Sequence, residues 1–215
     1  MVKYTDHIAG GLRKSPVRLG NTFDIPPAWE YPAYIDGRPY LLPADDQGKS
    51  SKCAAYAVAG IEEALEWFKT GKKKTVDPDP IYARAKELDD EAGEDNGTTL
   101  ESIIKAARSL HYFEDVEVFD VHNDLDLRYA LHRFPLVLVG LEITDGWNKV
   151  GDDGHVPDGS RKLGGHAMVD SFYNSYGPGG INSWGTSWGD SGRWYISWKQ
   201  FREQFMCAKG FSIIR

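Results

Sequence analysis

Apolar positions along the chain change their spacing near residue 112. Before that point they recur at three- and four-residue intervals, which is typical of helices with one buried face. This spacing predicts helices over 53–69 and 80–88, and a third helix that starts near Thr98. Thr98 and Glu101 have the spacing of a capping box, which indicates where the third helix begins.

After residue 112 the pattern favours strands. Residues 136–143 form a nearly continuous apolar run, as in a strand that is buried on both faces. The other predicted strands lie around 116–121 and at 166–173, 180–182, 193–197 and 211–215, with a helix over 124–133 and a loop rich in Gly and Asp over 145–165. Helices followed by strands predict an α+β protein with two lobes and a cleft between them.

The N-terminal part of the chain has neither periodicity. Residues 1–22 are polar, basic and interrupted by glycine and proline, so we expect a loosely attached extension. Residues 23–48 contain five prolines, which exclude a helix, and several aromatic residues that favour an extended arm packed on the body. The acidic stretch 89–95 is expected to be a solvated loop. The predicted domain therefore covers residues 23–215.

Composition restricts the classes of partner. A net charge of -7 argues weakly against nucleic acid, because phosphate binding needs a basic surface. No apolar run approaches the roughly 18 residues that a membrane span needs, and no secretion signal is visible at the N-terminus. His and Cys are not clustered as zinc ligands are, so we expect no metal and no cofactor. One disulfide between Cys53 and Cys207 is conceivable, but both must be free thiols if Cys53 is a nucleophile, and free thiols fit a reducing compartment. A cytoplasmic monomer is the expectation.

Two candidates for catalytic chemistry lie at the start of the first predicted helix and in the loop before it. Cys53 opens this helix, whose N-terminus favours an anion, so its thiol is expected to ionise more readily than a free thiol. Taken alone, it is more often a buried structural cysteine. Gln47 lies six residues upstream in a loop that contains glycine. That loop can fold back so that the Gln47 side-chain amide and the Cys53 backbone amide form an oxyanion hole.

Two further candidates lie in the strand-rich part. His166 and Asn182 are equidistant from Asn174, so a hairpin centred there places them opposite each other. The Asn182 carbonyl then accepts one imidazole N–H and leaves the other ring nitrogen for Cys53. The stretch 176–180 is also strong turn material, and a turn centred on it breaks this pairing.

These residues resemble the papain-like cysteine peptidases. The matching blocks are Gln47-Gly48 with Cys53 six residues after the glutamine, Gly165-His166-Ala167, and the long block that runs from Asn182-Ser183-Trp184-Gly185 to Gly192. The resemblance covers about residues 23–215. It departs from the family pattern at Ser50, where a disulfide cysteine is usual, and at Ala54, where an aromatic residue is usual. The family's long inhibitory propeptide also has no counterpart in 22 residues.

The resemblance implies a papain-like two-lobed fold with the active site in the cleft between the lobes. The helical lobe is expected at about 45–112, and the strand-rich lobe at about 113–215 together with the arm 23–44. The implied function is a cysteine endopeptidase that cleaves peptide bonds in a peptide or protein through a thioester intermediate. The implied catalytic residues are Cys53, His166, Asn182 and Gln47. The implied substrate-binding positions are Gly97, Thr98, Gly165 and Trp184. Trp184 is further expected to shield the histidine–asparagine hydrogen bond, and Trp188 to pack in the core.

Two other functions stay open at this point. A catalytically silent peptide-binding module on the same fold is supported by the altered residues Ser50 and Ala54. The same nucleophile also suits transpeptidation or hydrolysis of a non-peptide amide, and nothing in the sequence separates these reactions from peptide hydrolysis.

Overall fold

The computed structural model describes residues 10–15 and 21–214 of the chain. Its helices are α1 (Cys53–Thr70), α2 (Pro78–Leu88), α3 (Leu100–Ser109), α4 (Asp124–Arg133) and α5 (Trp198–Gln204). Its strands are β1 (Asn21–Thr22), β2 (Ile35–Asp36), β3 (Val116–Val121), β4 (Val137–Thr144), β5 (Lys162–Tyr173), β6 (Pro178–Ile181), β7 (Arg193–Tyr195) and β8 (Phe205–Ile213). Short 3-10 turns occupy Arg38–Tyr40 and Trp147–Lys149. The α+β prediction is confirmed.

Helix α1 is the longest helix in the described residues and is buried on most of its circumference. Small alanines at 54, 55, 57, 59 and 64 allow close packing, and Val58, Ile61 and Leu65 fill the space between neighbouring elements. The helix ends because Gly71 adopts a left-handed conformation (φ 71°) while its N–H bonds back to Trp67 O. This termination agrees with the prediction from sequence.

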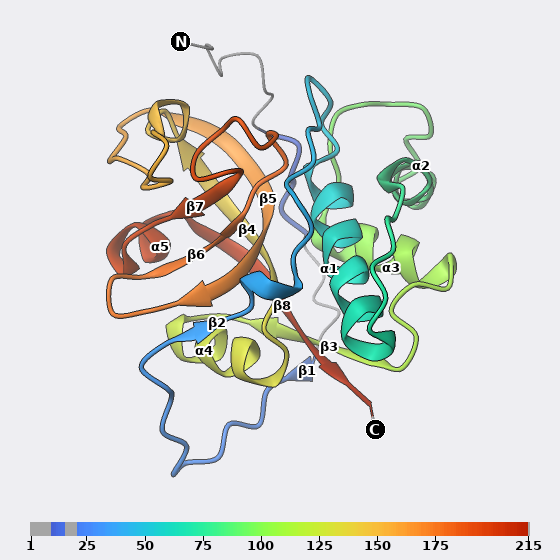
Figure 1. The fold of residues 1–215 in the computed structure, drawn as a ribbon. Helices are drawn as coiled ribbons and strands as arrows, with labels where there is room; N and C mark the ends of the chain where they lie inside the picture. Colours follow the sequence, from blue (N-terminus) through green and yellow to red (C-terminus); the bar gives the residue numbers. More distant parts are fainter. Residues whose placement is uncertain (1–9, 16–20, 215) are drawn as a thin grey trace.

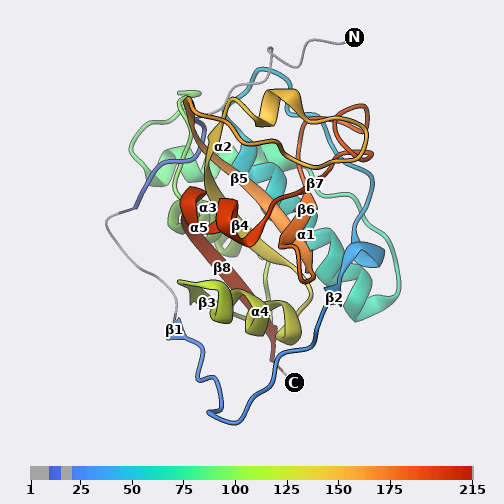
Figure 2. The same cartoon turned by 90° about the vertical axis from the view of Figure 1, so that its left-hand side faces the viewer.

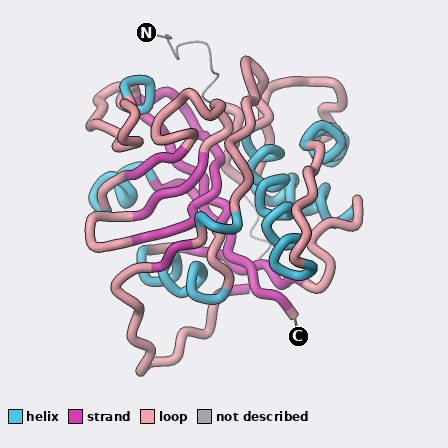
Figure 3. The backbone as a smooth tube through the Cα atoms, in the orientation of Figure 1, coloured by secondary structure: helices cyan, strands magenta, loops and turns pink. Residues whose placement is uncertain are grey.

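One sheet organises the other half of the molecule. Along it the strands run in the order β1-β3-β8-β4-β5-β6-β7, and β2 pairs with β5 outside this path. All pairs are antiparallel except β1 with β3. Helices α1, α2 and α3 lie together on one side of the sheet, while α4 and α5 lie away from them (Figures 1 and 2). The strands form a continuous block beside this helical group (Figure 3).

Strand β4 separates two hydrophobic clusters. Because side chains alternate between the faces of a strand, Leu138 points into the cluster that contains α1, α2 and α3. Val137, Val139 and Leu141 point into a second cluster that contains residues of α4 and α5 and five tryptophans. Burial on both faces explains why this strand reads as a continuous apolar run.

Several local predictions were wrong at element ends. The N-cap of α3 is Thr99, whose hydroxyl accepts from Ser102 N at 3.0 Å, and the Thr98 hydroxyl instead donates to Asp89. Helix α5 was not predicted, and β8 begins at Phe205 rather than at 211. Ser197 and Gln200 form a complete capping box at the start of α5, which was the available sequence signal.

The N-terminal extension also differs from its prediction. Residues 10–15 are not loosely attached: Leu12 is only 3% exposed and belongs to the same cluster as α1. Residues 1–9 and 16–20, which complete the predicted extension, lie outside the described residues. Neither is the acidic stretch 89–95 simply solvated, because Asp89, Glu91 and Asp95 all bind groups from other parts of the chain.

Candidate functional site

Cys53 occupies the first position of α1, as the sequence predicted. Its side chain is 0% exposed, and its Sγ accepts a hydrogen bond from Ala167 N at 3.5 Å. Ala167 directly follows His166 on β5, so this contact brings the start of α1 against the backbone that carries the histidine. Residues 114 positions apart are therefore neighbours within the first hydrophobic cluster.

The His166 ring is held by Asn182. Nε2 of the ring lies 2.8 Å from Asn182 Oδ1, and the same oxygen accepts from Ser183 N at 2.8 Å. A backbone N–H can only donate, so the atom it meets must be the asparagine oxygen and the side chain cannot be flipped. Nε2 must then carry a proton, and in the neutral form of the ring Nδ1 is the unprotonated nitrogen. The remaining nitrogen, Nδ1, is left as the proton acceptor.

The hairpin that joins these residues has a different register from the predicted one. Val169 pairs with Ile181 and Tyr173 with Pro178, so the turn lies at 174–177 rather than on Asn174 itself. A bulge between Asp170 and Phe172 shifts the pairing by one residue. His166 and Asn182 are consequently not direct cross-strand partners. The hydrogen bond forms because diagonal neighbours on one face are still within reach of long side chains.

Gln47 is connected to the same group of residues. Its Oε1 accepts from Ser183 Oγ at 2.6 Å, and its backbone N–H donates to Ser183 O at 2.9 Å. Its side-chain amide donates to Ser50 O at 2.7 Å, which uses one of the two amide hydrogens. Ser183 thus links Gln47 to Asn182, a role that sequence reasoning missed although Ser183 lies inside the recognised block.

Trp184 covers the histidine. Its ring centroid lies 5.0 Å from that of His166, and its side chain is 1% exposed. It packs edge-on against Trp188, which in turn stacks on Trp147. This arrangement agrees with the expected shielding of the hydrogen bond between His166 and Asn182. Because Trp184 is buried, it can support the His166 ring, but it has no exposed face with which to contact a substrate directly.

Residues 10–13, here called the crossing segment, run between the predicted substrate-binding positions. Gly10 N and Leu12 N donate to Gly165 O at 3.0 and 3.1 Å. On the other side, Thr98 N donates to Gly11 O at 2.9 Å and Arg13 N donates to Thr98 O at 2.8 Å. The segment is therefore bound as an extended peptide between the loop before α3 and the start of β5, parallel to Thr98.

Glycine residues, which have no side chain, leave the space for this close approach. A Cβ atom on Gly97 (φ 83°) would lie 2.0 Å from Gly11 O, and one on Gly165 would lie 2.3 Å from Leu12 O. The Leu12 side chain sits over Gly140, where a Cβ would lie 2.3 Å from its Cδ2 and 3.0 Å from Cys207 Sγ. Glycine at these positions thus accommodates the backbone and one branched side chain of the segment.

Burial changes the expected acidity of Cys53. Desolvation raises the pKa of its thiol to about 11, and the hydrogen bonds from Ala167, Ala54 and its own backbone N–H lower it by less. The helix N-terminus was expected to promote ionisation of the thiol. That expectation is wrong for the covered state, in which Cys53 is fully buried. Gly11 lies against Ser51, two residues before Cys53, and both Cys53 and His166 are 0% exposed.

Other sites are sparse within the described residues. No group of three or more His, Cys, Asp or Glu side chains in 10–15 and 21–214 is placed to hold a metal ion. Both cysteines, Cys53 and Cys207, are free thiols. Among the helices described, none has the length and apolar character to cross a membrane.

Comparison with known proteins yields similarity in structure and none in sequence. No protein-family model and no curated protein sequence matches the chain. The structure is similar to xylellain, a cysteine protease from Xylella fastidiosa, with a TM-score of 0.79 and 16% identity over 97% of this chain and 98% of that one. It is also similar to digestive procathepsin L 3 of Tenebrio molitor larval midgut (TM-score 0.70, 14% identity, 98% and 77%).

A third similar structure is procathepsin B S9 from Trypanosoma congolense, with a TM-score of 0.71 and 13% identity over 96% of this chain and 86% of that one. At such identities the likeness concerns the fold and leaves activity to be tested. Together with the helices on one side of the sheet and Cys53 at the start of α1, these comparisons show that the chain has the fold of the papain-like cysteine proteases.

Proposed function

We propose that this chain is a cysteine peptidase that cleaves peptide bonds through an acyl-enzyme intermediate. The observation that carries the proposal is the hydrogen bond between His166 Nε2 and Asn182 Oδ1 at 2.8 Å, beside a cysteine at a helix N-terminus. The bond sets the tautomer so that Nδ1 can take up a proton, and the adjoining contact from Ala167 to Cys53 brings the thiol to the same place.

In the proposed reaction His166 accepts the Cys53 proton and the thiolate attacks the peptide carbonyl carbon. The Cys53 backbone N–H and the second amide hydrogen of Gln47 stabilise the resulting oxyanion. The C–N bond then breaks as His166 gives its proton to the leaving amine, and a thioester remains on Cys53. Water, deprotonated by His166, attacks the thioester and releases the acid, which regenerates the thiol. Asn182 keeps the ring in position throughout.

The two cysteines of the chain provide a matched test. We expect Cys53→Ala to abolish cleavage of a denatured protein, a loss of about 10³-fold or more, while Cys207→Ala leaves the rate near that of the parent. An epoxysuccinyl probe is expected to label the peptide that contains Cys53, identified by mass spectrometry. His166→Ala should match the loss seen in Cys53→Ala. Turnover that survives in Cys53→Ala contradicts the proposal.

A peptide-binding module without turnover is the second candidate, because the complete burial of Cys53 and His166 favours it. It predicts that peptides bind and remain intact even when the crossing segment is weakened by substitution. Product analysis by mass spectrometry separates the two functions, and added amine acceptors reveal transpeptidation as a mass increase on the acyl fragment.

A further inference from the structure

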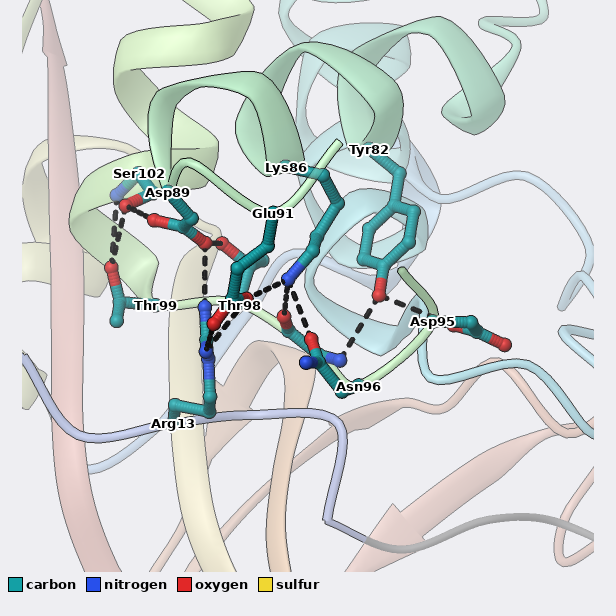
Figure 4. Close-up of polar contacts among 11 residues, drawn as sticks. Arg13, Tyr82, Lys86, Asp89, Glu91, Asp95, Asn96, Thr98, Thr99 and Ser102 are labelled. Atoms are coloured by element: carbon teal, nitrogen blue, oxygen red, sulfur yellow. Dashed lines mark hydrogen bonds and ion pairs between the residues drawn. The ribbon is translucent and has the colours of Figure 1, made fainter. Parts of the chain in front are cut away.

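The crossing segment ends in an arginine whose side chain is bound at both terminal guanidinium nitrogens. Arg13 Nη2 lies 2.7 Å from Asp89 Oδ2, and Nη1 lies 2.9 Å from Glu91 Oε2 (Figure 4). Lys14, the next residue, is exposed. An isolated ion pair on a surface contributes little, but a guanidinium shared by two carboxylates is both stronger and more specific.

Each of the two carboxylates is also bound by residues other than Arg13. Asp89, whose side chain is 11% exposed, accepts from Thr98 Oγ1 at 2.7 Å and from Ser102 Oγ at 2.5 Å. Glu91 is bonded to Lys86, which is 1% exposed. Hydrogen bonds from Lys86 and Arg13 lower the pKa of Glu91 to about 2, so this carboxylate stays charged above acidic pH.

Lys86 also connects this pair of carboxylates to the peptide-binding backbone. Besides Glu91 it donates to Asn96 Oδ1 at 2.6 Å and to Gly97 O at 3.0 Å. Gly97 is the residue against which Gly11 packs, and Thr98 pairs with the crossing segment through its N–H and C=O. One network of side chains therefore positions the carboxylates and the loop that binds the peptide backbone (Figure 4).

We propose that Asp89 and Glu91 form a guanidinium-binding subsite for peptides bound between Thr98 and Gly165, and that Arg13 occupies it in the resting chain. This subsite lies beside the position over Gly140 that holds the Leu12 side chain. Together the two positions select a peptide with an aliphatic residue next to an arginine. The inference rests on the proposed function, since the crossing segment lies where a peptide substrate is expected. An incoming peptide with these two side chains replaces residues 10–13.

The first experiment measures how fast iodoacetamide labels Cys53 in the full-length chain. Mass spectrometry of the labelled peptides separates Cys53 from Cys207. We expect labelling to be at least ten times faster in Arg13→Ala and in Asp89→Asn, because each removes one side of the contact that holds the segment. Lys14→Ala is the control for Arg13→Ala, and Glu94→Gln is the control for Asp89→Asn, because each removes a neighbouring charge of the same sign. Neither side chain takes part in this contact, so Cys53 should be labelled at the parental rate in both controls.

Arg13→Ala is the more informative of the two variants because it leaves the network around Lys86 intact. Labelling at the parental rate in Arg13→Ala overturns the proposal, whatever Asp89→Asn does. Equal acceleration in Lys14→Ala also overturns it, because the effect then follows general charge rather than the subsite.

The second experiment tests recognition of the guanidinium without relying on turnover. Two heptapeptides are compared in the Arg13→Ala chain: one with the sequence of residues 9–15, and a twin in which arginine is replaced by citrulline, which has a similar shape and no charge. We expect the arginine peptide to protect Cys53 from iodoacetamide at a concentration at least ten times lower. Adding Asp89→Asn should remove that difference, and Glu94→Gln should retain it.

Equal protection by both peptides, or protection by neither, overturns the proposal. Failure of the proposed peptidase activity has a different signature: the labelling and protection results stand, and no peptide is cleaved. If cleavage occurs, peptides with arginine beside leucine should be cut faster than their citrulline twins.

Discussion

At Cys53 two electrostatic effects oppose each other. A helix N-terminus stabilises an anion by roughly 0.3–1 kcal/mol, whereas removal of an ion from water costs several kcal/mol even after the protein relaxes. In the covered state the second effect is larger, which is why the pKa of this thiol rises to about 11. The sequence shows the helix terminus but gives no information about the residues that exclude water from it.

This balance predicts the ionisation of Cys53 in the resting chain. In a Cys207→Ala chain labelled with ¹³C at cysteine, the Cys53 Cβ chemical shift should remain that of a thiol from pH 6 to about pH 10. The change to the thiolate shift should be centred near the value of about 11 that burial imposes. A transition at or below pH 8.5, the pKa of a free thiol, contradicts the covered arrangement.

Among the elements, the hairpin β5–β6 and the helix α5 show how local signals combine with distant contacts. The bulge between Asp170 and Phe172 turns the side chains of β5 over, so that Val169 faces α1 while Tyr173 faces the second cluster. Helix α5 has only seven residues, too few for a periodic pattern, and its start depends on the capping box of Ser197 and Gln200.

The capping box predicts a measurable contribution to stability. Ser197→Ala removes the hydroxyl that accepts from Gln200 N at 3.1 Å, and should lower the free energy of unfolding by about 1 kcal/mol. Lys199→Ala, on the exposed face of the same helix, should change it by less than about 0.5 kcal/mol. Urea denaturation measures both. A loss no greater in Ser197→Ala than in Lys199→Ala shows that the cap does not stabilise α5.

On the scale of the whole molecule, a buried ion triad connects the helices to the sheet. Lys209 of β8 is 2% exposed and is bonded to Asp120 of β3 and, at 2.8 Å, to Glu101 of α3. Burial alone lowers the pKa of Lys209, but the hydrogen bonds that it donates to its two partners, and their negative charges, outweigh that effect and raise it above the ordinary value. The triad joins elements that are far apart in the sequence.

Two results follow for stability. Lys209→Ala leaves two buried carboxylates without their cation and should lower the free energy of unfolding by about 3–5 kcal/mol. Lys162→Ala removes an exposed ion pair with Glu142 and should cost less than about 1 kcal/mol. Denaturant unfolding at neutral pH tests this difference, and equal losses contradict it.

The same group gives the sign of a pH effect. Because the folded pKa of Lys209 is raised, its contribution to stability is complete below the unfolded value near 10.4 and is lost as pH rises through the folded pKa. The free energy of unfolding of the parent chain should therefore fall above about pH 10.4. Lys209→Met should show a smaller dependence in that range, and an identical slope in the two proteins contradicts the assignment.

Local information was sufficient for most of the helices and strands. The interior of α1, its end at Gly71, and the strand β4 follow from residue spacing and backbone preferences, which depend on neighbours in sequence. The three blocks around Cys53, His166 and Asn182 also predicted that these residues lie near one another, and the structure brings them together. Their catalytic roles stay predictions until they are tested.

Tertiary structure alone decided the features that depend on distant partners. The register of His166 and Asn182 depends on a bulge, and the start of α3 depends on Asp89, which binds the hydroxyl of Thr98. The acidic stretch could be read only as solvated until Arg13 and Lys86 were seen to bind it. By itself the sequence determined most of the elements that form and which residue types are present. The contacts that cover Cys53 join residues tens of positions apart, and the spacing of residues along the chain does not predict them.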